Sequence, residues 1–140
     1  MSVWTHVAGC VRIDALPFLR AEPVEDVVRR AFGKTCAYED DTEVWDECTV
    51  PCGSEGSVQY RVARTGTENE LSWGLVYIWG DLRNYSNADE ITTWLQGAIN
   101  AMRADGVWVR GLSVFVEIES GKQYSLITDD EGNIKATLVD

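Results

Sequence analysis

The segment Gly53-Ser54-Glu55-Gly56-Ser57 has the residue types of an anion-binding loop. Two glycines allow a tight turn with outward backbone N–H groups, and Ser54 and Ser57 add two hydroxyls. The segment lacks the lysine and the spacing of a P-loop, and it precedes a predicted strand, not a helix. Two interpretations stay open: an anion cradle built by Gly53, Ser54, Gly56 and Ser57, or a plain turn into the strand.

A second candidate lies in the segment Gly80-Asp81-Leu82-Arg83-Asn84-Tyr85, between a predicted strand and a predicted helix. The Arg83 guanidinium can bind a phosphate or a carboxylate through two N–H groups, and the Tyr85 ring can stack on a base. The helix expected from residue 88 onward would add the positive end of its dipole. The alternative is that Asp81 and Arg83 pair with each other and hold the turn. With the glycine loop, Arg83 and Tyr85 are the predicted binding residues for a small phosphorylated ligand.

Catalytic residues are not distinguished by the sequence. His6 is the single histidine, and no serine or cysteine is tied to it by a motif, because catalytic triads are recognised in space. Carboxylates are numerous, but no pair stands out from those that water solvates. An acidic loop can hold Mg²⁺, so a metal-dependent phosphodiesterase is the enzyme to keep in mind. The prediction is a protein that is not an enzyme and that uses no cofactor.

Four cysteines raise the question of a zinc site. Such a site would use Cys36, Cys48 and Cys52, with Cys10 or His6 as the fourth ligand. Structural zinc sites usually have two close pairs of ligands, whereas here only Cys48 and Cys52 are close in sequence. We therefore predict no metal site and free, buried or half-buried thiols.

Hydrophobic periodicity predicts the elements that must position these residues. Alternation of apolar and polar residues predicts strands over residues 3–14, 58–62, 71–79, 107–119, 123–128 and 134–138. Helical spacing predicts helices over residues 23–32 and 88–105, the second begun by Asn87 and Glu90 in the manner of a capping box. Residues 34–56 are predicted to form a long acidic loop with room for one short strand.

The order β-α-β-β-α-β-β-β predicts one α+β domain over residues 1–140, an antiparallel sheet with both helices on one face. This order is close to a split β-α-β arrangement that a C-terminal hairpin extends. The other face of the sheet would carry large rings that no helix covers. Such a face usually marks a partner, often a second copy of the same chain. The residues predicted to drive self-association into a homo-oligomer are Trp4, Trp73, Tyr77 and Trp79.

The charge limits the possible partners. The chain has 140 residues and a formal net charge of −11, so free nucleic acid is a poor partner, because phosphate binding depends on clustered lysine and arginine. The acidity has three possible reasons: solubility alone, a patch for a basic protein, or mimicry of a nucleic-acid backbone. The predicted acidic partner-binding residues are Asp40, Asp41, Glu43, Asp46 and Glu47.

Location is inferred from what the sequence lacks. There is no apolar run of about 18 residues, so we expect no membrane contact. The N-terminus has no basic stretch followed by an apolar one, so we expect no secretory signal. The protein should then act inside the cell that makes it, where thiols stay mostly reduced.

Several motifs together suggest an origin. They are Val3-Trp4-Thr5-His6-Val7-x-Gly9-x-Val11-Arg12-Ile13-Asp14, Pro51-Cys52-Gly53-Ser54-Glu55-Gly56-Ser57-Val58-Gln59-Tyr60, Gly80-Asp81-Leu82-Arg83-Asn84-Tyr85 and Glu90-Ile91-x-x-Trp94. Over most of the chain they resemble a group of small bacteriophage and prophage proteins of unassigned function. Cys48 and Cys52 depart from that group. The resemblance implies a phage origin and action in the cytoplasm of the bacterial host cell, and it implies no mechanism.

Two binding functions then compete. In the first, the protein is a non-enzymatic counter-defence factor that sequesters a small phosphorylated, nucleotide-type immune signal of the host. In the second, it is an acidic inhibitor of a host defence protein, or a nucleic-acid mimic, and the loop at residues 39–47 docks on a basic surface. A third possibility is a virion-associated structural protein. The local chemistry of the glycine loop, Arg83 and Tyr85 and the phage resemblance favour the first function, which is the one we predict, whereas the net charge favours the second.

Overall fold

The computed structural model describes residues 2–15, 23–35, 37–39, 42–44, 48–64 and 72–139. In chain order the elements within these ranges are β1 (Trp4–Ala15), α1 (Val24–Phe32), β2 (Ala37–Glu39), β3 (Thr42–Val44), β4 (Gln59–Arg64), β5 (Ser72–Arg83), α2 (Ala88–Ala104), β6 (Val107–Ile118), β7 (Lys122–Thr128) and β8 (Ile134–Val139).

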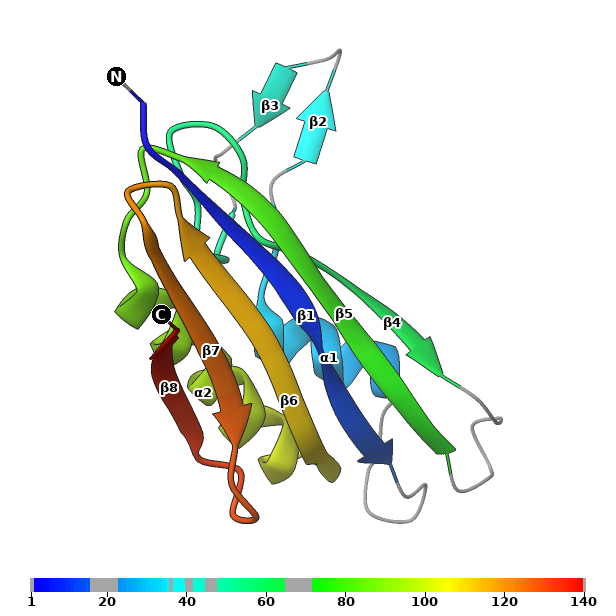
Figure 1. Cartoon of the computed structure of the whole chain (residues 1–140). Coiled ribbons are helices and arrows are strands. Elements are labelled where there is room, and N and C mark those ends of the chain that lie inside the picture. Colours follow the sequence, from blue (N-terminus) through cyan, green and yellow to red (C-terminus); the bar gives the residue numbers. More distant parts are fainter. Residues whose placement is uncertain are drawn as a thin grey trace.

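Six of the strands form one antiparallel sheet in the order β4-β5-β1-β6-β7-β8. β5 lies between β1 and β4, so the first β-α-β unit is split by a third strand, as in ferredoxin-like folds. The hairpin of β7 and β8 extends the sheet beyond β6. Both helices lie behind the sheet in Figure 1, on one of its faces. The predicted α+β fold class and element order are confirmed.

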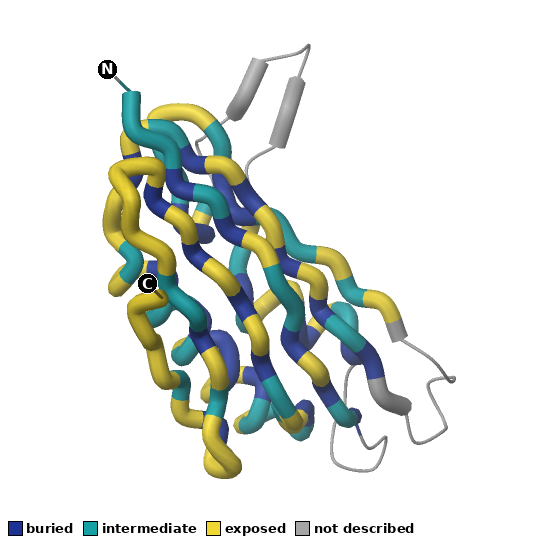
Figure 2. The backbone as a smooth tube through the Cα atoms, viewed as in Figure 1, coloured by how far each residue is buried: buried dark blue, intermediate teal, exposed yellow. Residues whose placement is uncertain are grey.

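The core lies between the helices and the sheet. Along β1, the residues that point toward the helices are buried and those between them are more exposed, and Figure 2 shows this alternation on the neighbouring strands as well. The helices contribute their apolar stripes to the same layer, made of Val24, Val27, Val28 and Phe32 from α1 and Ile91, Leu95, Ala98, Ile99 and Met102 from α2. Neither of the helices in the described ranges lies against the second face of the sheet, and we call this surface the open face.

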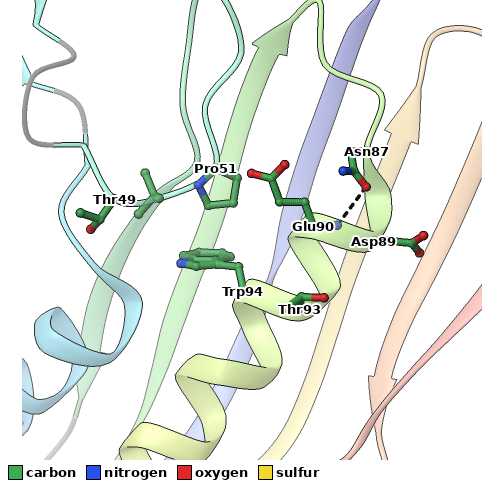
Figure 3. A pocket seen from close by; sticks show the side chains of 8 residues that line it. Thr49, Pro51, Asn87, Asp89, Glu90, Thr93 and Trp94 are labelled. Carbon is green, nitrogen blue, oxygen red and sulfur yellow. Dashed lines mark hydrogen bonds between the residues drawn. The ribbon is translucent and has the colours of Figure 1, made fainter.

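Local signals begin and end the helices. The Asn87 side chain accepts a hydrogen bond of 3.1 Å from the backbone N–H of Glu90 and so caps α2. The carboxylate of Glu90 turns toward Pro51 (Figure 3). It does not turn back toward Asn87, as the second half of the predicted capping box would require. α1 ends at Phe32 and is followed by Gly33, whose φ of 100° is a backbone conformation that favours glycine.

The structure corrects two boundaries. β2 and β3 pair with each other as a small hairpin, where the sequence predicted at most one short strand, because three-residue strands are too short to show a period of two. β5 continues to Arg83 instead of ending near residue 79, since Gly80 to Arg83 pair with β1 from Val7 back to Trp4. Arg83 therefore belongs to a strand and not to the connection before α2.

Part of one prediction lies outside the described residues. Asp40, Asp41, Asp46 and Glu47 of the acidic segment are not among them, and neither is the side chain of Glu43. Among the helices described, none is both long enough and apolar enough to cross a membrane.

Candidate functional site

The Gly53–Ser57 loop is fastened to the end of β5. The backbone N–H of Ser54 donates to the carbonyl of Arg83 over 2.8 Å, and the N–H of Arg83 donates to the carbonyl of Glu55 over 2.9 Å. Within the loop, the N–H of Gly53 donates to the carbonyl of Gly56 over 2.9 Å. The N–H groups of Gly53 and Ser54 are thus bonded within the protein.

The two glycines of this loop are needed for close packing. Gly56 has a φ of 76°, and a side chain there would overlap the carbonyl oxygen of Asp81. A side chain at Gly53 would overlap the backbone of Arg83. Ser57 is buried, and its hydroxyl donates to the carbonyl of Val58 over 3.2 Å. The loop therefore packs closely against the end of β5 and holds it in place, and we call this role a clasp.

Arg83 and Tyr85 do not project together into solvent. The Arg83 guanidinium donates to the Glu55 carboxylate over 2.6 Å and to the Ser2 hydroxyl over 3.0 Å, so its partner is not Asp81. Tyr85 is only 7% exposed. Burial raises the pKa of Tyr85, and the nearby Glu90 adds to the rise, although no described residue hydrogen-bonds its hydroxyl. The structure brings the loop to Arg83 and places the Tyr85 side chain in the core.

His6 lies between two carboxylates that the sequence analysis did not connect with it. Its Nδ1 lies 2.6 Å from Oδ1 of Asp81, and its Nε2 lies 2.9 Å from Oε1 of Glu119. These hydrogen bonds, that of Asp81 first, raise the pKa of His6. No local sequence signal indicates this contact, because it depends on the register of β1, which aligns His6 with Asp81 on β5 and with Glu117 on β6.

The cysteines fall into separate places. Cys48 and Cys52 are half-buried with their sulfur atoms 2.6 Å apart, Cys10 is half-buried on the open face of β1, and Cys36 lies outside the described residues. Within the described ranges, no group of three or more histidine, cysteine, aspartate or glutamate side chains is arranged to hold a metal ion.

A cavity of about 480 Å³ lies beside the first turn of α2 (Figure 3). It is lined by Thr49, Val50, Pro51, Asn87, Asp89, Glu90, Thr93 and Trp94. The indole N–H of Trp94 donates to the carbonyl of Phe32 over 2.6 Å, and its ring meets the Phe32 ring edge-on, with centroids 5.4 Å apart. Two contacts with the end of α1 therefore fix the orientation of the Trp94 ring.

The lining of this cavity fits a cation better than an anion. Asp89 and Glu90 are exposed carboxylates, and they offset the positive end of the α2 dipole. An aromatic face beside carboxylates is the combination that binds ammonium and guanidinium groups. The sequence predicted a capping role for Glu90 and no site role for Trp94, although their spacing of four residues places both on one side of the helix.

The open face carries the large rings that the sequence predicted there. Tyr77 is 45% exposed and Trp79 is 46% exposed. Trp4 is half-buried, and the backbone of Trp73 pairs with Asp14 while its side chain lies outside the description. Phe115 is 51% exposed and was missed, although it alternates with the buried Val114 and Val116 on β6.

No protein-family model, curated protein or solved structure matches this chain. The phage resemblance therefore stays a prediction from the motifs.

Proposed function

We propose that this chain is a non-enzymatic, acidic binding protein that docks on a basic segment of another protein. The observation that carries the proposal is the cavity beside α2, which is lined by the fixed Trp94 ring and by the acidic residues Asp89 and Glu90. In Figure 3 the Glu90 carboxylate turns toward Pro51, whereas that of Asp89 turns away from Trp94. Of the functions that the sequence leaves open, this is the inhibitor of a host protein. The resemblance to phage proteins is our reason to place that partner among host defence proteins.

Several features support a basic partner. The net charge of −11 attracts a basic surface from a distance and speeds association. Inside the cavity, an arginine or lysine side chain could lie along the Trp94 ring with its charge near Glu90. Because the Trp94 ring is already held by the Phe32 carbonyl, binding would not have to order it, and a prearranged site loses less entropy on binding.

The competing function, sequestration of a phosphorylated signal, has less support from the geometry. A phosphate that binds the Arg83 guanidinium would lie beside the Glu55 carboxylate, which already accepts from that guanidinium and would repel a second anion. The Tyr85 ring would also have to leave the core to stack on a base.

The test uses arginine hexapeptide as the probe and glutamine hexapeptide as the uncharged control, with binding followed by calorimetry. The double variant Asp89→Asn, Glu90→Gln is compared with Asp130→Asn, Glu131→Gln in the turn between β7 and β8. Each double variant loses two negative charges, so both have a net charge of −11 + 2 = −9. Attraction by net charge is therefore matched, and only the cavity differs.

We expect the cavity variant to weaken peptide binding by about five- to thirty-fold, the effect of losing two exposed charge contacts at about 0.5–1 kcal/mol each. The matched control should change binding less than about twofold. Equal weakening in both variants would mean that only net charge matters, and the proposal would be wrong.

Three further measurements separate the other functions. If cyclic nucleotides or ADP-ribose derivatives raise the melting temperature and Arg83→Ala abolishes this shift, the protein sequesters a ligand instead. Turnover of nucleotides by the purified protein, lost when the carboxylates at residues 39–47 are neutralised, would contradict the non-enzymatic assignment. Recovery of the protein with virion parts would favour the structural role.

A further inference from the structure

The open face changes character along the strands. At one end His6 lies between Asp81 and Glu119, and Glu117 is aligned with His6 on β6. Two residues along β1, Ala8 is aligned with Trp79 on β5 and with Phe115 on β6. The face is therefore acidic at this end, and it becomes aromatic toward its middle.

The other end is basic. Cys10 of β1 is aligned with Tyr77, which in turn is aligned with Arg61 of β4. Arg12 follows Cys10 on the same side of β1. Both arginines are exposed, and neither forms an ion pair or hydrogen bond with another residue in the described part of the chain. The basic end of the open face thus offers two charges that have no partner among the residues that the structure describes.

We propose that the open face is the interface of a homodimer in which two copies pack face to face with their strands antiparallel. We call the residues of the neighbouring strands that are aligned with one residue of β1 a row. A two-fold axis that runs across the strands at Gly9 places the row of His6 over the row of Arg12 of the second copy. Arg12 then lies opposite the acidic end, within reach of Asp81 and Glu117. The symmetry repeats this contact, so one residue pattern gives two sets of ion pairs.

The middle of the face matches itself under the same symmetry. The row of Ala8 lies over the row of Cys10 of the second copy, so Trp79 faces Tyr77. Offset or edge-on pairs of such rings stabilise an interface beyond the area that they bury. Ala8 and Cys10 are small and leave room between the rings on β5 and Phe115 on β6. In the alternative arrangement, with parallel strands, the acidic ends of the two copies would face each other and the two Arg12 side chains would lie close together. Repulsion between like charges disfavours this arrangement.

The size of the face predicts a dimer of moderate stability. Six strands cover about 24 Å across, and the rows from residue 6 to residue 12 cover about 20 Å along the strands. The two copies would together bury on the order of 1,000 Å², the lower end for a specific interface. Reversal of a single charge at Arg12, which the symmetry repeats, should then be enough to separate the copies.

The experiment is a charge swap followed by light scattering and native mass spectrometry at tens of micromolar protein. The chain should have a mass near 2 × 15.6 = 31.2 kDa. Arg12→Glu alone and Glu117→Arg alone should each be monomers, because each places like charges opposite each other twice. Mixed together, they should form a heterodimer, since both contacts become attractive again. Arg29→Glu on α1 carries the same charge change away from the open face and should stay dimeric.

Three results would overturn the proposal: an unmodified chain that is monomeric, an Arg12→Glu variant that stays dimeric, or single variants that do not recombine. A dimer that resists Arg12→Glu and is lost on Thr137→Pro would show pairing through the edge strand β8 instead. Circular dichroism of each variant checks that it is folded. The double variant Asp89→Asn, Glu90→Gln should leave the dimer intact, because α2 lies on the other face of the sheet. The dimer and the cation cavity can therefore fail separately.

Discussion

Replacing Gly56 by alanine tests whether the glycine loop is a clasp on β5. The substitution adds one methyl group to the protein. It does so at a residue with φ of 76°, where that methyl would overlap the carbonyl oxygen of Asp81. The loop cannot keep its place on β5 without a shift of the backbone.

The expected loss of stability has two parts. A non-glycine residue in a left-handed conformation costs about 1–2 kcal/mol. Moving the loop away from β5 breaks or weakens two backbone hydrogen bonds, from Ser54 to the Arg83 carbonyl and from Arg83 to the Glu55 carbonyl, at about 1 kcal/mol each. The free energy of unfolding should therefore fall by about 3–4 kcal/mol.

Gly121→Ala is the matched control. Gly121 also has a positive φ, of 110°, but an added methyl group would meet no atom within 4 Å. It should lose only the conformational part, about 1–2 kcal/mol. Urea unfolding followed by tryptophan fluorescence gives both values, and the difference of about 2 kcal/mol should appear as about 6–10 °C in melting temperature.

Equal losses for Gly56→Ala and Gly121→Ala, within about 0.5 kcal/mol, would refute this reasoning. The loop would then be free to move without disturbing β5, and its backbone N–H groups could again be considered for anion binding. A much larger loss for Gly56→Ala, with the folded circular dichroism spectrum kept, would support the clasp.

Three further predictions concern single positions. Gly97 is exposed within α2 and has open space around it, so Gly97→Ala should raise the free energy of unfolding by about 0.5–1 kcal/mol in urea titrations; a loss would contradict it. Asn87→Ala removes the side-chain cap of α2 and should cost about 1 kcal/mol by the same method, while Asn87→Asp keeps most of it. Asp81 and Glu119 raise the folded pKa of His6. His6 should therefore add stability that is complete below its unfolded pKa of about 6.5 and that is lost as pH rises through the folded value. The melting temperature should depend less on pH across this range in His6→Gln.

The elements and their faces could be read from the sequence because their signals are local. Alternation along β1 and β6 separates buried from exposed residues, and Asn87 begins a helix by a contact only three residues long. The same alternation placed Tyr77 and Trp79 on the uncovered face, where they are found. These signals depend on each residue and its near neighbours, so no knowledge of the tertiary structure was required.

The contacts among the candidate functional residues depend on the tertiary structure. His6 meets Asp81 and Glu119 only because β1 lies between β5 and β6 in one particular register. Arg83 pairs with Glu55 because the glycine loop returns to the end of β5, and the orientation of Trp94 depends on the last carbonyl of α1. Each of these partners is far away in sequence. Strand register results from many side chains packing at once, and no local periodicity encodes that choice.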